Sequence, residues 1–565
     1  MKKIGKIILG IVIAILALQI LGVVVVYLSR RIKPETVLTL RIEGDIPEQP
    51  PQDALRDLLV GPPTTVTDIV EALERARTDP RITGIEVRVS ESTMNMAKIQ
   101  DIRDQIREFN RSGKFSLAYL EFATDRSYYL ASACQSVFLL PKSLLYIRGM
   151  MASTTFLRGT LDKLGISPDL FHIGEYKNAT NIFTEKKYTP AHREATEALV
   201  NDWYGEFLRG VAEARGLKPE DVAKALAEGP FSSDGALSRR LVDQVAYYDQ
   251  VRNFEKQKNH GSENRISLRT YLDRTGGDGG TKLAVIYATG TILPGRSGDT
   301  PFGEEVMGAD TIAEQFRRVR EDGSVKAVVL RVDSPGGAAF ASEVIRREVE
   351  ITRLRKPVVV SMSDVAASGG YWISMSANKI VAEPGTITGS IGVLTGKFNI
   401  KGLYDKLGLS QDLVTTTDNS TLDWPFQNYT PAQREIVTKQ MHDIYNDFIT
   451  GVAKGRHLRV EDVEKIARGR VWTGERAQKL GLVDELGGLY TAISQAKELA
   501  KIPVGEKVSL ELLPPRRSLL DRLLSLAGNA EYFSGAFSVR AWLQTVESLA
   551  SQPVWTILTG VPQVQ

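Results

Sequence analysis

The segment GYWISMSANKIVAEP, Gly370–Pro384, has a near copy elsewhere in the chain. SYYLASACQSVFLLP, Ser127–Pro141, shows the same order of small, aromatic and apolar residues 243 positions earlier. PRITGIEVRV, Pro80–Val89, and GSVKAVVLRV, Gly323–Val332, repeat at the same offset. Self-similarity over such a distance indicates a tandem duplication of one large structural unit.

Further matches extend the duplication toward the C-terminus. LDKLGISPDL, Leu161–Leu170, repeats at Tyr404–Leu413, and YTPAHREA, Tyr188–Ala195, repeats at Tyr429–Ile436. The offset falls from 243 to 241 between these pairs, so the second copy has lost two residues. We therefore expect four parts, which are an N-terminal anchor (1–34), a first copy (35–275), a second copy (276–500) and a tail (501–565). The tail holds amphipathic segments that fit either helix packing or contact with a membrane surface.

Short apolar runs alternate with helical patterns in each copy, which predicts an α/β fold. In the second copy KLAVIYATG and VKAVVLRVD have the composition of buried strands. Between them DTIAEQFRRVRED is an amphipathic helix pattern, with Asp310 as the expected N-cap. Strand–helix–strand order with apolar strands predicts a parallel sheet covered by helices.

Composition excludes several classes of function. The 565 residues carry a net charge of only +3, which argues against a nucleic-acid-binding face. Cys134 is the single cysteine, so no intrachain disulfide can form, and its apolar surroundings argue against a thiol nucleophile. Five scattered histidines without a CxxC or HExxH motif predict no metal site, and we expect no cofactor.

The N-terminus has the pattern of a membrane anchor. After MKKIGK comes an apolar run, Ile7–Leu28, long enough to span a bilayer as a helix. A cleaved signal peptide is the alternative, but the apolar core is long and no small-x-small cleavage site follows it. We expect an uncleaved single-pass anchor with the bulk of the chain outside the cytoplasm.

Candidate catalytic residues fall where the two copies differ. SMSDVAASGGYW places Ser368 after a strand and before a helix, and the aligned residue of the first copy is Asp125. The turn DSPGG, Asp333–Gly337, aligns with SESTM, Ser90–Met94, so the first copy lacks both the serine and the double glycine. In the other direction Lys177 has no lysine counterpart in the second copy. Complementary loss of this kind indicates one composite site shared by both copies.

A serine–lysine pair needs an unprotonated lysine. The ordinary pKa of lysine is about 10.4, and burial can lower it by several units. Glu175 is the difficulty, because strand alternation would place it on the same face as Lys177. We expect Glu175 to turn outward or the strand to end before it. His172 could serve as a conventional base, but the pattern favours a histidine on a strand surface.

Attack on a carbonyl also needs hydrogen-bond donors for the oxyanion. Gly336 and Gly337 allow close approach and positive φ, and Gly369 begins a helix whose N-terminus carries partial positive charge. We predict the amides of Gly337 and Gly369 as the oxyanion hole.

DSPGG, SDVAASGGYW and TGSIG (Thr388–Gly392) together resemble the motifs of the signal peptide peptidase A family, also called protease IV, in its long duplicated form. The resemblance implies a Clp protease/crotonase-like spiral of ββα units after one transmembrane helix. It also implies a dyad of Ser368 and Lys177, with Ser390 orienting the lysine. Asn178 departs from the family, which usually has serine after the lysine.

The family resemblance also implies a setting and a substrate class. We expect a homotetramer on the bacterial inner (cytoplasmic) membrane, with its bulk on the periplasmic side. Its expected substrates are remnant signal peptides and other short hydrophobic or unfolded peptides. Two alternatives stay open from the residues alone. One is a crotonase-like acyl-CoA enzyme that uses the glycine turn, and the other is an inactive membrane scaffold or adaptor.

Overall fold

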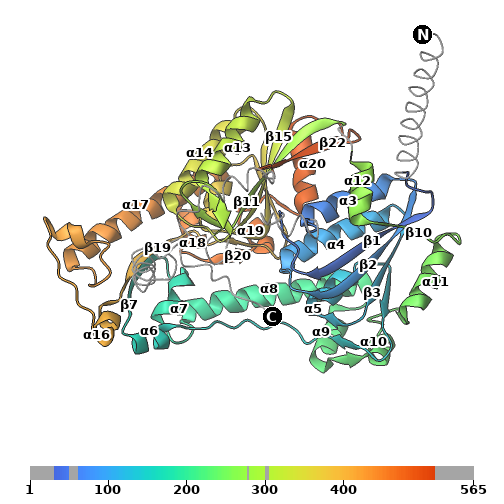
Figure 1. Ribbon diagram of the computed structural model, residues 1–565, viewed down its shortest axis with the longest axis horizontal. Coiled ribbons are helices and arrows are strands. Elements are labelled where there is room, and N and C mark those ends of the chain that lie inside the picture. Colours follow the sequence, from blue (N-terminus) through green and yellow to red (C-terminus); the bar gives the residue numbers. More distant parts are fainter. Residues whose placement is uncertain (1–30, 50–61, 277–278, 300–304, 516–565) are drawn as a thin grey trace, which may run out of the picture.

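A computed structural model describes residues 31–49, 62–276, 279–299 and 305–515 (Figure 1). The expected anchor, Ile7–Leu28, lies outside the described residues, as do the amphipathic segments of the tail. Within the described ranges no helix has the length and apolar character needed to cross a membrane.

The first copy is built on a six-stranded sheet in which every neighbouring pair is parallel. In spatial order its strands are β10 (Asn264–Ser267), β1 (Thr36–Gly44), β2 (Ile82–Ser92), β3 (Phe115–Leu120), β5 (Ser136–Leu139) and β9 (Gln244–Val245). The principal helices of this copy are α3 (Val66–Thr78), α4 (Met96–Arg111), α5 (Asp125–Ala131), α8 (Pro190–Arg215), α9 (Pro219–Glu228), α11 (Tyr248–Lys258) and α12 (Leu268–Thr275).

The second copy repeats this plan on a larger sheet. Its main path runs β20 (Val471–Thr473), β18 (Ile387–Gly389), β16 (Val358–Ala367), β15 (Val325–Ser334), β11 (Thr281–Thr289) and β22 (Val508–Leu513). Off this path, β17 (Lys379–Ala382) pairs with β16, and β21 (Glu485–Leu486) pairs with β17. Only the β18–β20 pair is antiparallel among these strands. The helices are α13 (Ala309–Glu321), α14 (Ala339–Arg353), α15 (Gly369–Ser374), α17 (Pro431–Arg456), α18 (Val460–Ile466), α19 (Gly474–Lys479) and α20 (Leu489–Leu499).

Helices cover both faces of this sheet, as the unbroken apolar strands predicted. Along β15, Val328 and Leu330 point into the core shared with Phe316 of α13. The alternate residue Val329 points into the opposite core, shared with Ile493 of α20. Every residue of β16 is buried. A parallel sheet buried on both faces therefore carries the segment that leads to Ser368.

Strand pairing and side-chain contacts join the two copies, and Figure 1 shows β7 (Ser167–Ile173) and β19 (Val393–Asn399) side by side. β7 of the first copy pairs antiparallel with β19 of the second. On α8, Trp203 donates its indole N–H to the carbonyl of Gly385 at 2.8 Å. These contacts bring residues about 200 positions apart to one place, as a composite site requires.

Two expectations from the sequence need correction. The second sheet continues beyond residue 500, because β22 pairs with β11 just as β10 pairs with β1. This part of the predicted tail therefore belongs to the second copy. Asp310 is not the N-cap of α13. The helix begins at Ala309 with Gly308 as its cap, and Asp310 lies in the first turn.

Candidate active site

Ser368 occupies the turn between β16 and α15, and its backbone is strained. β16 ends at Ala367 and α15 begins at Gly369, so one residue joins strand to helix. Its φ of 54° and ψ of −116° are rare for a residue with a side chain and cost about 1–3 kcal/mol. The Ser368 amide donates to the Gly389 carbonyl at 2.9 Å, which helps to hold this geometry. Strain of this kind clusters at functional sites.

Lys177 reaches Ser368 from the first copy. It follows β7 and precedes the short 3₁₀ helix η1 (Asn178–Thr180). Its Nζ lies 2.9 Å from Ser368 Oγ, 2.8 Å from the Ser390 carbonyl oxygen and 3.0 Å from Ser390 Oγ. The side chain is buried, with 4% of its surface exposed. The structure therefore brings together the three residues that the sequence placed in a serine–lysine site.

Glu175 does not form an ion pair with Lys177. β7 ends at Ile173, before the alternation that would align Glu175 with Lys177. The Glu175 carboxylate is largely exposed and lies 3.6 Å from the guanidinium of Arg468. Across the described ranges the ion pairs include none with Lys177. Both expectations for Glu175 are therefore met, because the strand ends before this residue and its side chain turns outward.

Burial sets the protonation of Lys177. It lowers the pKa of the amine from 10.5 to about 7, and no charged neighbour contributes to the shift. A lysine in an apolar site loses the hydration that its ammonium form needs, whereas the neutral amine loses little. About half of the molecules therefore hold a neutral, proton-accepting amine at pH 7.

The glycine turn lies directly against the serine. Gly336 and Gly337 have φ of 108° and 156°, in the region that favours glycine. A β-carbon at Gly369 would lie 3.1 Å from the Gly337 amide nitrogen, so the two predicted donor amides are neighbours. The bridge between Ile292 and Gly337 uses the Gly336 carbonyl and the Ala338 amide, which leaves the Gly337 N–H out of that bridge.

A large cavity opens beside these groups. Its volume is about 830 Å³, and it contains Ser368, Lys177 and Gly337 on its wall. Apolar side chains from both copies line it, among them Leu157, Ile182 and Leu199 from the first and Trp372, Val437 and Met441 from the second. The cavity is large enough for several residues of an extended peptide and favours apolar ones.

Sequence reasoning missed two residues of this site. Gly469, with φ of 76°, packs on the lysine so closely that a β-carbon would lie 2.5 Å from Lys177 Cβ. The only signal was a glycine between two arginines before a strand. His192 lines the cavity, and burial lowers its pKa to about 4, so it is neutral near pH 7. His172 is exposed on β7, its Nδ1 lies 3.0 Å from the Gly174 carbonyl oxygen, and it is not among the residues that line the cavity.

The matching position in the first copy has no nucleophile. Asp125 begins α5, and its carboxylate accepts hydrogen bonds from the amides of Arg148 and Gly149 at 3.1 and 3.2 Å. The pocket beside it has a volume of only about 40 Å³. Among the described residues, the large cavity therefore lies at the predicted composite site, and the equivalent position of the first copy has only a small pocket.

Comparison with known proteins identifies the family. Peptidase family S49 matches two stretches of the sequence, residues 108–260 and residues 350–503. The chain belongs to peptidase family S49. Its two copies are duplicated S49 domains, and the protein is a serine peptidase in an α/β fold.

Relatives of this S49 peptidase cover most of its length. The chloroplastic serine protease SPPA of Arabidopsis thaliana is 33% identical over 89% of this chain and 75% of its own. Protease 4 of Salmonella typhi is 35% identical over 86% of this chain and 79% of its own. Protease 4 of Haemophilus influenzae is 32% identical, with 83% and 80% covered.

The comparison with solved structures is weaker. A ClpP1 mutant from Listeria monocytogenes aligns with 37% of this chain and 94% of its own, at 14% identity and a TM-score of 0.25. A likeness this slight does not bear on the fold, so the Clp protease/crotonase-like spiral stays a prediction.

Proposed function

We propose that this S49 peptidase cuts peptide bonds with a Ser–Lys dyad, in which Ser368 is the nucleophile and Lys177 the general base. One observation carries the proposal, namely a buried amine 2.9 Å from the serine hydroxyl with burial as the one cause of its lowered pKa. A serine hydroxyl is a weak nucleophile until an adjacent base takes its proton.

Acylation follows from this geometry. Neutral Lys177 accepts the proton of Ser368 as Oγ forms a bond to the carbonyl carbon of the substrate. The amides of Gly337 and Gly369 donate to the resulting oxyanion, and such donors are typically worth 10²–10³-fold in rate. The lysine ammonium then gives its proton to the departing amine as the C–N bond breaks, which leaves an acyl-enzyme on Ser368.

Deacylation reverses these roles with water in place of the amine. Neutral Lys177 takes a proton from water as its oxygen attacks the ester, and the ammonium returns that proton to Ser368 Oγ. The Ser390 hydroxyl and carbonyl, both within 3.0 Å of Nζ, keep the amine aimed at the serine through both half-reactions.

The cavity supports a peptide substrate of apolar character. Its volume and the apolar side chains on its wall favour short hydrophobic or unfolded segments, including remnant signal peptides. A folded protein would not present an extended segment to a serine on the wall of this cavity. We therefore propose endopeptidase action on such segments.

The proposed setting is a membrane surface. The apolar run Ile7–Leu28 would anchor residues 1–34 in the inner membrane of a bacterium, with the copies at 35–275 and 276–500 on the periplasmic side. Family resemblance favours a homotetramer of ββα spiral domains in this setting. No nucleic acid or cofactor is part of the proposal.

The test is peptide hydrolysis by two variants and a matched control. Ser368→Ala and Lys177→Ala should each abolish cleavage of a hydrophobic peptide while the oligomer stays intact. Lys187→Ala, which removes an exposed lysine ten positions away, should leave cleavage unchanged. Full activity in either dyad variant would refute the mechanism. Turnover of an acyl-CoA thioester in place of the peptide would favour the crotonase-like enzyme. No turnover of either substrate by the wild type would favour the inactive scaffold or adaptor.

A further inference from the structure

The strand that carries the nucleophile bulges just before it reaches Ser368. Pairing between β15 and β16 joins Val332 to Met362 and resumes at Ser334 with Ala366. One residue of β15, Asp333, therefore faces three residues of β16, 363–365. A bulge bends a strand and re-aims the residues that follow it. Here the residues that follow on the two strands are the glycine turn and Ser368.

Side chains hold the bulge where the ladder of backbone hydrogen bonds is interrupted. The Asp333 carboxylate accepts the amide of Val365 at 3.1 Å. Thr386 donates its hydroxyl to the carbonyl of Ser363 at 2.8 Å. The conformation of the bulge therefore depends on the position of the Asp333 carboxylate, which must itself be held.

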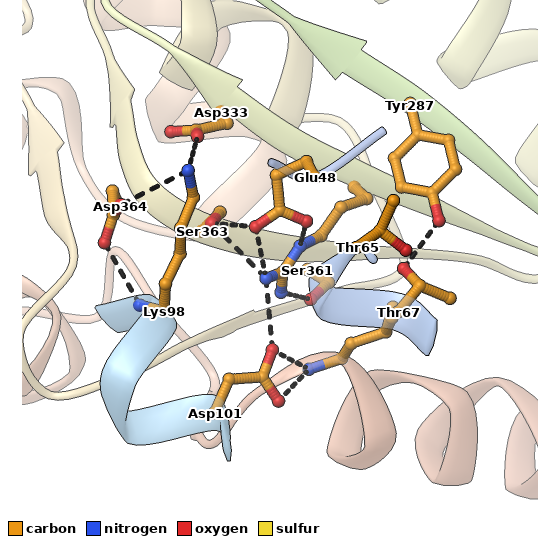
Figure 2. Close-up of polar contacts among 12 residues, drawn as sticks. Glu48, Thr65, Thr67, Lys98, Asp101, Tyr287, Asp333, Ser361, Ser363 and Asp364 are labelled. Carbon is orange, nitrogen blue, oxygen red and sulfur yellow. Dashed lines mark hydrogen bonds and ion pairs between the residues drawn. The ribbon is translucent and has the colours of Figure 1, made fainter. Parts of the chain in front are cut away.

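Lys98 holds that carboxylate from the other copy (Figure 2). This lysine lies in the first turns of α4, and its side chain is 8% exposed. Its Nζ is 3.5 Å from Asp333, 3.7 Å from Asp364 and 3.7 Å from Asp45. Its backbone amide also donates to Asp364 at 3.1 Å. One residue thus joins both strands of the bulge.

A second cation supports the same bulge from its far side. Arg331 donates to Ser361 at 2.8 Å and to Ser363 at 3.3 Å. Its guanidinium is buried against the carboxylates of Glu48 and Asp101, both from the first copy. Ser363 also donates to Glu48 (Figure 2). Lys98 is the cation nearer to the glycine turn, because its partner Asp333 directly precedes Ser334 and that turn.

The buried carboxyl groups of Asp333 and Asp364 need a cation beside them to remain ionised. Burial raises the pKa of Asp333 to about 7 and also raises that of Asp364, and the ammonium of Lys98 opposes both rises. Burial alone would lower the pKa of Lys98, but its carboxylate partners raise it above the ordinary value. Without Lys98 two buried carboxyl groups would face each other, and charge repulsion or protonation would change their hydrogen bonds.

This brace, in which Lys98 of the first copy bridges Asp333 and Asp364 of the second, has no counterpart at the equivalent positions of the other half. At the 243-residue offset Lys98 corresponds to Ala341 and Asp333 to Ser90. The first copy is also irregular at the equivalent place, since β3 ends at Leu120 and β4 (Ala123–Thr124) is separate, so the two copies differ in the bridging lysine and not in the irregular strand. A feature needed for the fold alone would be expected in both copies.

We propose that Lys98 is a positioning residue, which fixes the oxyanion turn relative to Ser368 by bridging Asp333 and Asp364 across the β16 bulge. The first copy then contributes two residues to the site, Lys177 as the base and Lys98 as the positioning residue. The inference rests on the proposed dyad mechanism. Lys98 acts through Asp333 and Asp364 and does not touch the reacting atoms.

The test compares kcat with KM in purified full-length variants. Lys98→Met should lower kcat for a peptide ester by about 10- to 100-fold, the range expected for a misplacement near 1 Å, with KM largely unchanged. Lys98→Arg, which still reaches both carboxylates, should recover most of this loss. As a control, Arg209→Met breaks the exposed pair that Arg209 makes with Glu475 at 2.8 Å between the copies, and should change neither constant.

Thermal unfolding identifies the variants that fold. If Lys98→Met does not fold, Asp364→Asn replaces it, because asparagine can still accept the Lys98 amide while one charge of the brace is lost, and kcat should again fall. Wild-type kcat in the folded variant, a change confined to KM, or a loss that Lys98→Arg does not reduce would overturn the proposal. Activity in Ser368→Ala or Lys177→Ala would refute the dyad instead, so the two failures are distinguishable.

Discussion

The rate of serine acylation should rise with pH through a single ionisation near 7. Only the neutral amine of Lys177 can accept the Ser368 proton, and burial lowers its pKa to about 7. About a tenth of the molecules would be active at pH 6, half at pH 7 and nine-tenths at pH 8. The rate should therefore increase close to tenfold between pH 5 and pH 6, about fivefold between pH 6 and pH 7, and level off above pH 8.

A neutral fluorophosphonate is the appropriate reagent, because it reports acylation and its own charge does not change with pH. Second-order rate constants for modification would be measured from pH 5 to pH 10. His192, with a pKa lowered to about 4, stays neutral over most of this range and does not shape the profile. Asp333 is the competing explanation, because burial raises its pKa to about 7 as well.

Asp333→Asn separates the two ionisations. This variant should react more slowly, because it weakens the brace, but it should keep a midpoint near 7 because Lys177 is unchanged. A profile that keeps rising to pH 10 would mean an ordinary, hydrated lysine and would refute the reasoning. Loss of the midpoint in Asp333→Asn would assign the ionisation to the aspartate.

Three further predictions concern the surroundings of the dyad. Lys177→Met should raise the free energy of unfolding at pH 7 by up to about 4 kcal/mol, because a buried amine whose pKa falls from 10.5 to about 7 opposes folding. The unfolded chain binds the extra proton between pH 7 and 10.5, so chemical denaturation should show a smaller gain at pH 9 than at pH 6. Gly469→Ala puts a β-carbon 2.5 Å from Lys177 Cβ and should lower kcat more than it raises KM, whereas Glu175→Gln should leave both unchanged. Gly337→Ala places a β-carbon 2.1 Å from the Ile292 carbonyl oxygen, so its rate of phosphonylation should fall by at least about 10²-fold, and an unchanged rate would remove Gly337 from the oxyanion hole.

The sequence predicted the duplication and the meeting of Lys177 with Ser368 because both depend on comparing the copies. Lys177 and Ser368 each stand where the other copy has lost the group, and such a difference can be read without coordinates. The apolar runs that became β11, β15 and β16 were equally clear, since strands buried on both faces are continuously hydrophobic.

Other features depend on contacts that no local pattern records. β22 was assigned to the tail because VSLELL shares no residue pattern with NRIS of β10, although both strands take the same place in their sheets. The bulge in β16 is held by contacts with Lys98, Asp333 and Thr386, and nothing in SMSDVAAS distinguishes it from a regular strand. Lys98 resembles any lysine near the start of a helix until its three carboxylate partners are known.

The location of the covalent adduct tests the central claim most directly. Wild-type protein and Lys177→Met would be treated with the fluorophosphonate at pH 8 and digested, and the modified peptide identified by mass spectrometry. We predict a single adduct on Ser368 in the wild type and none at that serine in Lys177→Met over the same time. An adduct on another residue, or modification of Ser368 in Lys177→Met at the wild-type rate, would contradict the claim that a first-copy amine activates a second-copy hydroxyl.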